Sequence, residues 1–170
     1  MNLMSTPLPE VWLRGPVDGF PPQVMPAVHT LLQVREDLHH LVATVPPERV
    51  WERPSGAASI GFHLRHTGGA LERLLTYARG ESLSPEQLER LRTEEKPGES
   101  LDEIGQFVDR IIDAALEQLR LTTPAMLLEA RTVGRGRLPS TVGGLIFHAA
   151  EHSTRHLGQA ITTARILTGR

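Results

Sequence analysis

The sequence predicts an all-α fold: a four-helix bundle with a proline-rich N-terminal arm over residues 1–22 and a short extra helix between the second and third long helices. Four segments of about five turns or more carry apolar residues at helical spacing, which is what such a bundle requires. No convincing run of alternating strand residues accompanies them. With 170 residues, 39% of them hydrophobic, the chain is expected to form one domain over residues 1–170.

The arm contains most of the prolines among the first 26 residues, so we expect it to be extended or turn-rich. Trp12, Leu13 and Phe20 are expected to pack it along the domain. Helical periodicity then begins, and the first long helix is expected over residues 24–45. Pro46 and Pro47 stop this helix because proline cannot continue it.

The second long helix is expected over residues 59–78, and Gly80 ends it. Ser84-Pro85-Glu86-Gln87 has the pattern of a capping box with proline at the first helical position, so the short helix begins there. A second capping box, Ser100-Leu101-Asp102-Glu103, opens the third long helix.

The last long helix begins after Pro139-Ser140 and continues nearly to Arg170. Residues 131–137, which precede it, contain three arginines around a turn. An anionic substrate could be attracted there, but the segment is expected to be a solvated loop.

Composition excludes several classes of function. The formal net charge is −2 and no basic cluster occurs, so no nucleic-acid partner is expected. The absence of cysteine excludes disulfides and thiolate ligands, and any thiol chemistry would need an external thiol. No targeting segment and no apolar run near the ~18 residues of a membrane span is found, so we expect a cytoplasmic protein without a membrane partner.

The last helix contains His148, His152 and His156, which recur every four residues. This spacing stacks the rings on one side of a helix, so two of them could hold a single metal ion. Counted from the apolar stripe at Ala149, His156 lies about 20° away, His152 about 60° and His148 about 100°. We therefore expect His152 and His156 to face the interior, where a shared cation would offset the cost of burying them.

A third ligand is expected from the second helix, where residues 62–66 contain both His63 and His66. Helical phase places His63 closer to the centre of the apolar stripe. Phe62 and Tyr77 lie on the His66 side of a wide apolar arc, so both histidines fit inside. The pattern predicts a tris-histidine metal centre between two helices and leaves the choice between His63 and His66 open.

Two other interpretations compete with a metal centre of this kind. The histidines could be ordinary core or surface residues bonded to their neighbours. His148-Ala149-Ala150-Glu151-His152 also matches the H-x-x-E-H arrangement of certain metalloproteases. Those enzymes take a third ligand well downstream, whereas no acidic residue follows His152 here. Glu151 is therefore expected to be solvated or to support a ligand.

Three glycines, Gly68, Gly69 and Gly158, lie inside expected helices. Each costs about 1 kcal/mol relative to alanine. Close approach of another helix, or access to a site, would offset that cost. Simple tolerance of glycine is the other interpretation.

The segment His152-Ser-Thr-Arg-His156-Leu-Gly158-Gln159 resembles the last helix of the DinB-like superfamily, which carries H-x-x-x-H-x-G-Q. Residues 59–66 resemble the second-helix motif of the same family, in which the closing histidine is the ligand. The helix order and residues 10–15 of the arm extend the likeness over nearly the whole chain.

This resemblance implies a bundle, often dimeric, in which one divalent metal is bound by His66, His152 and His156. It implies open positions for water or a small-molecule substrate, with His63 and His148 as candidates for lining the pocket or supporting the ligands. Related families include thiol S-transferases and isomerases that use mycothiol or bacillithiol, while other members resemble metal-dependent hydrolases. A homodimer is expected on the same ground.

A vacant position beside three neutral imidazoles suits a catalytic zinc or nickel ion, which lowers the pKa of bound water toward ~7 or stabilises a bound thiolate. The reaction would be hydrolysis, or transfer to or from a low-molecular-weight thiol. This interpretation predicts a pocket lined by residues such as Tyr77 and Arg155. The alternative is a non-catalytic, stress-related bundle with structural or sensory metal binding, closed by His63 or His148 as a fourth ligand.

Overall fold

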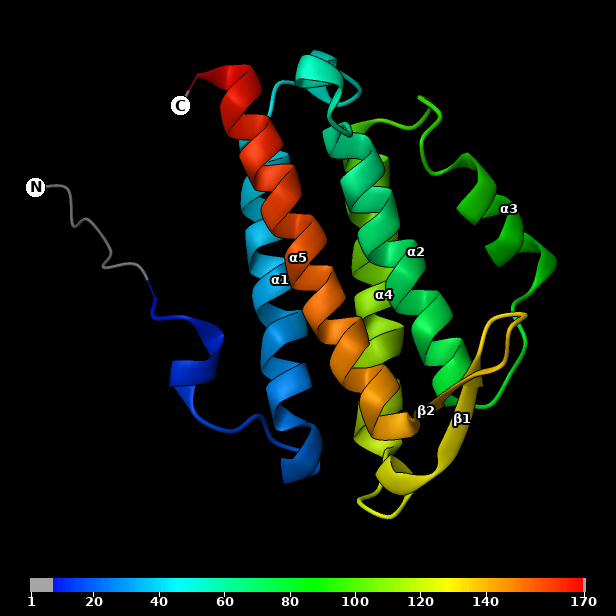
Figure 1. Ribbon diagram of the computed structural model, residues 1–170. Helices are drawn as coiled ribbons and strands as arrows, with labels where there is room; N and C mark the ends of the chain where they lie inside the picture. The colour runs from blue at the N-terminus through cyan, green and yellow to red at the C-terminus, as the bar shows by residue number, and fades with distance from the viewer. Residues whose placement is uncertain (1–7, 170) are drawn as a thin grey trace, which may run out of the picture.

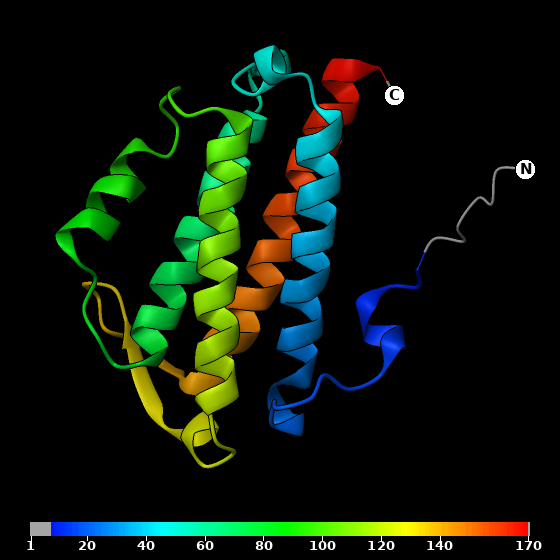
Figure 2. The ribbon, with the colours of Figure 1, turned by 180° about the vertical axis from the view of Figure 1, so that it is seen from behind.

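The computed structural model describes residues 8–169. Four long helices form a bundle (Figure 1): α1 (Met25–Thr44), α2 (Ile60–Ala78), α4 (Leu101–Leu121) and α5 (Val142–Thr168). Helices α1 and α2 each pack against both α4 and α5, so the order around the bundle is α1, α4, α2, α5. The short helix α3 (Pro85–Thr93) lies outside the bundle, beside α2 (Figure 2). The predicted all-α fold is confirmed.

The helices begin and end where the local signals predict. The Ser59 side chain accepts a hydrogen bond from the Phe62 N–H at the start of α2. Ser84 and Ser100 each form a complete capping box, so the predicted starts of α3 and α4 are confirmed. These caps satisfy N–H groups that the first turn of a helix leaves without a partner.

One apolar core runs along the bundle axis and draws on all four long helices. Each fully buried aliphatic side chain contributes about 1.5–3 kcal/mol to it. Its members with 2% exposure or less include Val28, Leu31 and Leu38 of α1, Ile60, Leu64 and Leu71 of α2, Ile104, Val108 and Ile112 of α4, and Leu145, Leu157 and Ala160 of α5. Within residues 8–169, no helix has both the length and the apolar character needed to cross a membrane.

A small β-hairpin precedes α5, where we expected a solvated loop without strands, and that expectation was wrong. Strands β1 (Ala130–Val133) and β2 (Leu138–Thr141) pair antiparallel around a turn with Gly134 and Arg137 at positive φ. Their residues are half-buried or exposed, so they lack the apolar alternation by which a strand is predicted. Pro139 is tolerated because both strands of a two-stranded ribbon are edges.

The described part of the arm, from residue 8 onward, packs along α1. Val11 is its buried anchor, and its N–H donates to the Gln33 side chain (3.0 Å). Phe20 packs against the core, as predicted. Trp12 is 62% exposed and Leu13 is 57% exposed, so the prediction that these two pack the arm was wrong: the turn that buries Val11 directs the next two side chains outward. The arm before residue 8 lies outside the described residues.

Candidate metal centre

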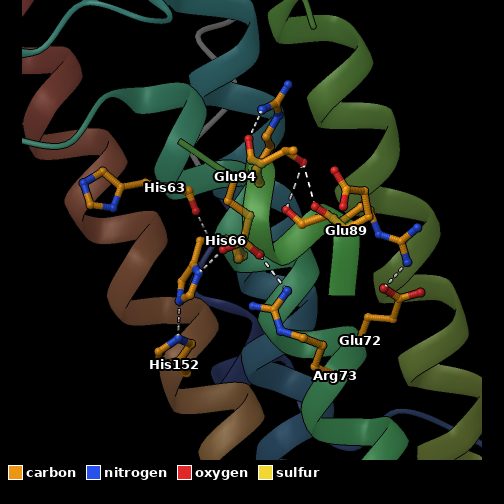
Figure 3. Close-up of polar contacts among 11 residues, drawn as sticks. His63, His66, Glu72, Arg73, Glu89, Glu94 and His152 are labelled. Atoms are coloured by element: carbon orange, nitrogen blue, oxygen red, sulfur yellow. Dashed lines mark hydrogen bonds and ion pairs between the residues drawn. The ribbon is translucent and has the colours of Figure 1, made fainter. Parts of the chain in front are cut away.

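Three histidines meet where α2 packs against α5. His66 of α2 and His152 and His156 of α5 each offer one ring nitrogen, and these three atoms all lie within 4.8 Å of one another. The Nε2 atoms of His66 and His152 are 3.0 Å apart (Figure 3). The His156 ring lies against both of the others, with centroid separations of 4.4 Å and 4.5 Å. The structure thus brings together residues that are 86 and 90 positions apart in the chain.

The i, i+4 spacing on α5 places His152 and His156 on the side that faces α2, where both are half-buried. His148, one turn earlier, has a side chain that is 47% exposed, as its predicted flank position requires. Its Nδ1 lies 3.4 Å from the Glu151 carboxylate, and Glu151 also forms an ion pair with Arg155. Glu151 therefore pairs on the outer side of α5.

The rings of His152 and His156 are neutral at physiological pH. Burial, followed by the electrostatic interaction with His66, lowers the pKa of His152 to about 4, and the same two causes lower the pKa of His156 to about 4. Burial and His66 also lower the pKa of His63. A neutral imidazole keeps a lone pair on one ring nitrogen, which is the form that binds a metal ion.

His66 is oriented by a buried carboxylate that follows α3. Its Nδ1 lies 2.7 Å from Oε2 of Glu94, and the other oxygen of Glu94 accepts a hydrogen bond from Arg73 (2.6 Å) (Figure 3). A carboxylate can only accept, so Nδ1 of His66 carries a proton, and the neutral form of the ring has its lone pair on Nε2. That lone pair is directed toward His152. The Phe62 ring stacks on the other side of His66, with centroids 5.4 Å apart.

His63 lies behind His156. Its side chain is 7% exposed, and its Nδ1 is 3.3 Å from Nδ1 of His156. The phase argument that placed His63 at the centre of the buried stripe agrees with this burial. The ring nitrogen that joins the cluster nevertheless comes from His66, the residue that the family resemblance selects.

The chemistry of this donor set fits a divalent ion. Three imidazole nitrogens are ligands that zinc, nickel and related ions accept. The buried Nδ1 of His152 has no hydrogen-bond partner within the described part of the chain. Leaving that atom unpaired costs about 1–3 kcal/mol.

The other predicted pocket residues lie elsewhere. Tyr77 is three turns beyond His66 on α2, about 16 Å along the helix, and lines a hollow with Arg131 and Thr132 of the hairpin. Arg155 lines a hollow between α1 and α5 together with Phe147. Tyr77 is therefore remote from the histidine cluster, whereas the Arg155 charge is near enough to contribute to the lowered pKa of His152 and His156.

Sequence reasoning missed Glu94 and Arg73. Glu94 is the C-cap of α3 and contacts His66 across 28 residues of sequence. Neither hydrophobic periodicity nor a sequence motif identifies Glu94 as a functional residue. The one signal available is that it follows a helix with few apolar residues, which suggests attachment by polar contacts. Arg73 lies on the expected second helix, and its 8% exposure is the feature that a sequence does not reveal.

Comparisons with known proteins support the same fold. A family model for the DinB superfamily matches residues 30–160, which include all three clustered histidines. A crystal structure described as the conserved protein of a locus from Enterococcus faecalis superposes with a TM-score of 0.62 at 17% identity, covering 85% of this chain and 96% of that one. No curated protein matches the sequence. On the match to the family model, this chain belongs to the DinB superfamily.

Proposed function

We propose that this protein binds one divalent metal ion, zinc or nickel, through His66, His152 and His156, and that it is a metal-dependent enzyme. The observation that carries the proposal is the convergence of three ring nitrogens within 4.8 Å from two helices. Neutral rings and a lone pair fixed on Nε2 of His66 support it.

An open coordination position favours an enzyme over a closed structural site. A closed site needs a fourth protein ligand, for which His63 and His148 are the candidates. The Nδ1 of His63 is already engaged by His156, and that of His148 lies near Glu151. Neither residue belongs to the group of ring nitrogens within 4.8 Å of one another, which among the described residues consists of His66, His152 and His156. This supports a fourth position that a small-molecule substrate could take.

When bound, such an ion supplies Lewis acidity, which makes water or a thiol acidic enough to act as a nucleophile near neutral pH. This chain's own residues hold and orient the three rings, and Phe62 covers His66. The reaction proposed is therefore hydrolysis of a small molecule or transfer to or from a low-molecular-weight thiol. Because the chain contains no cysteine, turnover that requires an added thiol would select transfer, and turnover without one would select hydrolysis.

Metal analysis of the purified protein tests the proposal. We expect about one divalent ion per chain and loss of that stoichiometry in His152→Ala and in His156→Ala. His39→Ala is the matched control, since His39 pairs with Asp109 on the exposed side of α1. If the histidine variants keep the ion, or if the control loses it, the assigned ligands are wrong.

We also propose a homodimer. Phe147 is 70% exposed, and Trp12 is 62% exposed, beside hollows that run between α1 and α5. Exposed aromatic side chains around such hollows favour a protein partner. Sedimentation velocity should give twice the mass of one chain, and Phe147→Glu should shift the protein toward single chains. A wild-type protein that sediments as one chain would contradict this proposal.

A further inference from the structure

Helix α3 is attached to the bundle by polar contacts. The buried side chains of this helix and its C-cap, a segment that is described in full, are Gln87 and Glu94. Gln87 donates to Thr76 of α2 (2.9 Å), while Glu94 reaches His66 and Arg73. A cavity of about 340 Å³ lies between α3 and α4. The packing of the apolar core therefore does not account for the place of α3.

Glu94 is the most buried residue of α3 and its C-cap, with 5% exposure. Burying a carboxylate is costly unless its oxygens are paired, and here one oxygen faces the Nδ1 of His66 while the other faces Arg73. Arg73 is itself 8% exposed. The arginine holds the carboxylate in place, and the carboxylate in turn holds the ring.

Gly69 makes room for this pair. A Cβ at Gly69 would lie 2.6 Å from Oε1 of Glu94 and 2.7 Å from Nη1 of Arg73, closer than side-chain carbons approach such atoms. The glycine therefore lets the ion pair lie against the backbone of α2, one turn from His66. At this glycine it is therefore an ion pair between two side chains, and not the approach of another helix, that needs the missing Cβ.

The three clustered histidines differ in what faces their other ring nitrogen. His66 has a charged carboxylate, His156 has the neutral ring of His63, and the buried Nδ1 of His152 has no partner among the described residues. A carboxylate behind a ligating imidazole fixes the tautomer and makes the ring a stronger donor. His66 is thus the best oriented of the three.

We propose that Glu94 is a positioning residue for the metal centre, and that α3 delivers this carboxylate to His66. The predicted effect of Glu94 on metal affinity rests on the proposed metal centre. The predicted effect of Glu94 on the tautomer of His66 applies to the metal-free protein as well.

The test compares Glu94→Gln with Glu72→Gln in the full chain. Both changes are isosteric and remove one carboxylate from the contact between α2 and α3, since Glu72 pairs with Arg90 (Figure 3). Of these two glutamates, Glu94 contacts a histidine of the cluster and Glu72 does not. Competition with a chromophoric chelator measures the affinity for Zn²⁺, and nitrogen NMR of the histidine rings reports the tautomer of His66 without metal.

Glu94→Gln should weaken Zn²⁺ binding by about 10–100-fold and remove the strong preference of His66 for the Nδ1–H tautomer. Glu72→Gln should leave both properties unchanged. An unchanged tautomer and affinity in Glu94→Gln would overturn the inference. If Glu94→Gln loses its helical circular dichroism, Glu94→Asp replaces it: the shorter carboxylate should give an intermediate loss, and affinity equal to wild type would overturn the inference.

Failure of the metal centre itself gives a different result. A wild-type protein that binds no Zn²⁺ contradicts the proposed function, while the tautomer measurement still decides whether Glu94 positions His66. The two proposals can therefore fail separately.

Discussion

His152 and His156 determine how the centre responds to acid. Each ring loses hydration in the contact between α2 and α5, and each lies beside other imidazoles that would repel a second positive charge. A proton and a metal ion compete for the same lone pairs. The arrangement that keeps these rings neutral for a cation also makes them costly to protonate in the folded protein.

The stability of the metal-free protein should therefore fall as the pH is lowered from 7 toward 4. The pKa of each ring is about 4 when folded, against 6.5 ordinarily, so in this window the unfolded chain binds protons that the folded chain does not. Solvent reaches both rings and weakens the effect. We expect a loss on the order of 1–2 kcal/mol per ring, measured by urea unfolding at several pH values.

The control for this prediction is the double variant His152→Ala/His156→Ala. This variant keeps the carboxylates that also titrate in acid. One of them is Glu36, whose pKa is lowered by its hydrogen bond to Arg14. The stability of the variant should depend less on pH than that of wild type. Equal pH dependence in both proteins would show that the two rings are not the source.

For the individual histidines of α2, helical phase predicted which ring is more buried but not which ring joins the cluster. His63 lies nearer the centre of the buried stripe, and it is the more buried of the two α2 histidines. The cluster uses His66 because its ring lies against both His152 and His156 of α5, whereas the His63 ring lies against His156. Glu94 could not be predicted, since its contact with His66 depends on how the chain after α2 folds back and brings the end of α3 against α2.

At the scale of elements, predictability followed local chemistry. The starts of α2, α3 and α4 depend on a serine that caps its own helix, so the sequence alone predicts them. The hairpin before α5 depends on pairing between two short strands that expose residues on both faces. Such pairing leaves no periodic apolar signal, which is why we expected a loop.

Two glycines in helices should respond oppositely to alanine. Gly69→Ala pushes a Cβ into the Glu94–Arg73 pair, so overpacking of about 1–3 kcal/mol should outweigh the gain of about 1 kcal/mol in helix propensity. Gly158→Ala meets nothing within 4 Å and should stabilise the protein by about 1 kcal/mol. Thermal unfolding measures both. A stabilising Gly69→Ala would mean that the ion pair moves aside freely.

At the scale of the whole molecule, the order of helices around the bundle is what creates the site. Because α2 packs against α5, a motif near residue 66 meets a motif near residue 156 with the apolar core behind both. Tyr77 shares α2 with His66 but lies toward the hairpin end, so sharing a helix did not place it in the same pocket. Sequence patterns predicted the helices and the histidines, while the position along each helix decided which side chains meet.

The central claim is that one cation joins α2 to α5 through three rings. A crystal grown without chelator, with diffraction recorded on both sides of the zinc and nickel absorption edges, tests it most directly. The account predicts one anomalous peak per chain at ligand distance, about 2.0–2.1 Å for zinc, from a ring nitrogen of each of His66, His152 and His156. A peak elsewhere, or well-ordered rings with no peak between them after growth in excess Zn²⁺ and Ni²⁺, would contradict it.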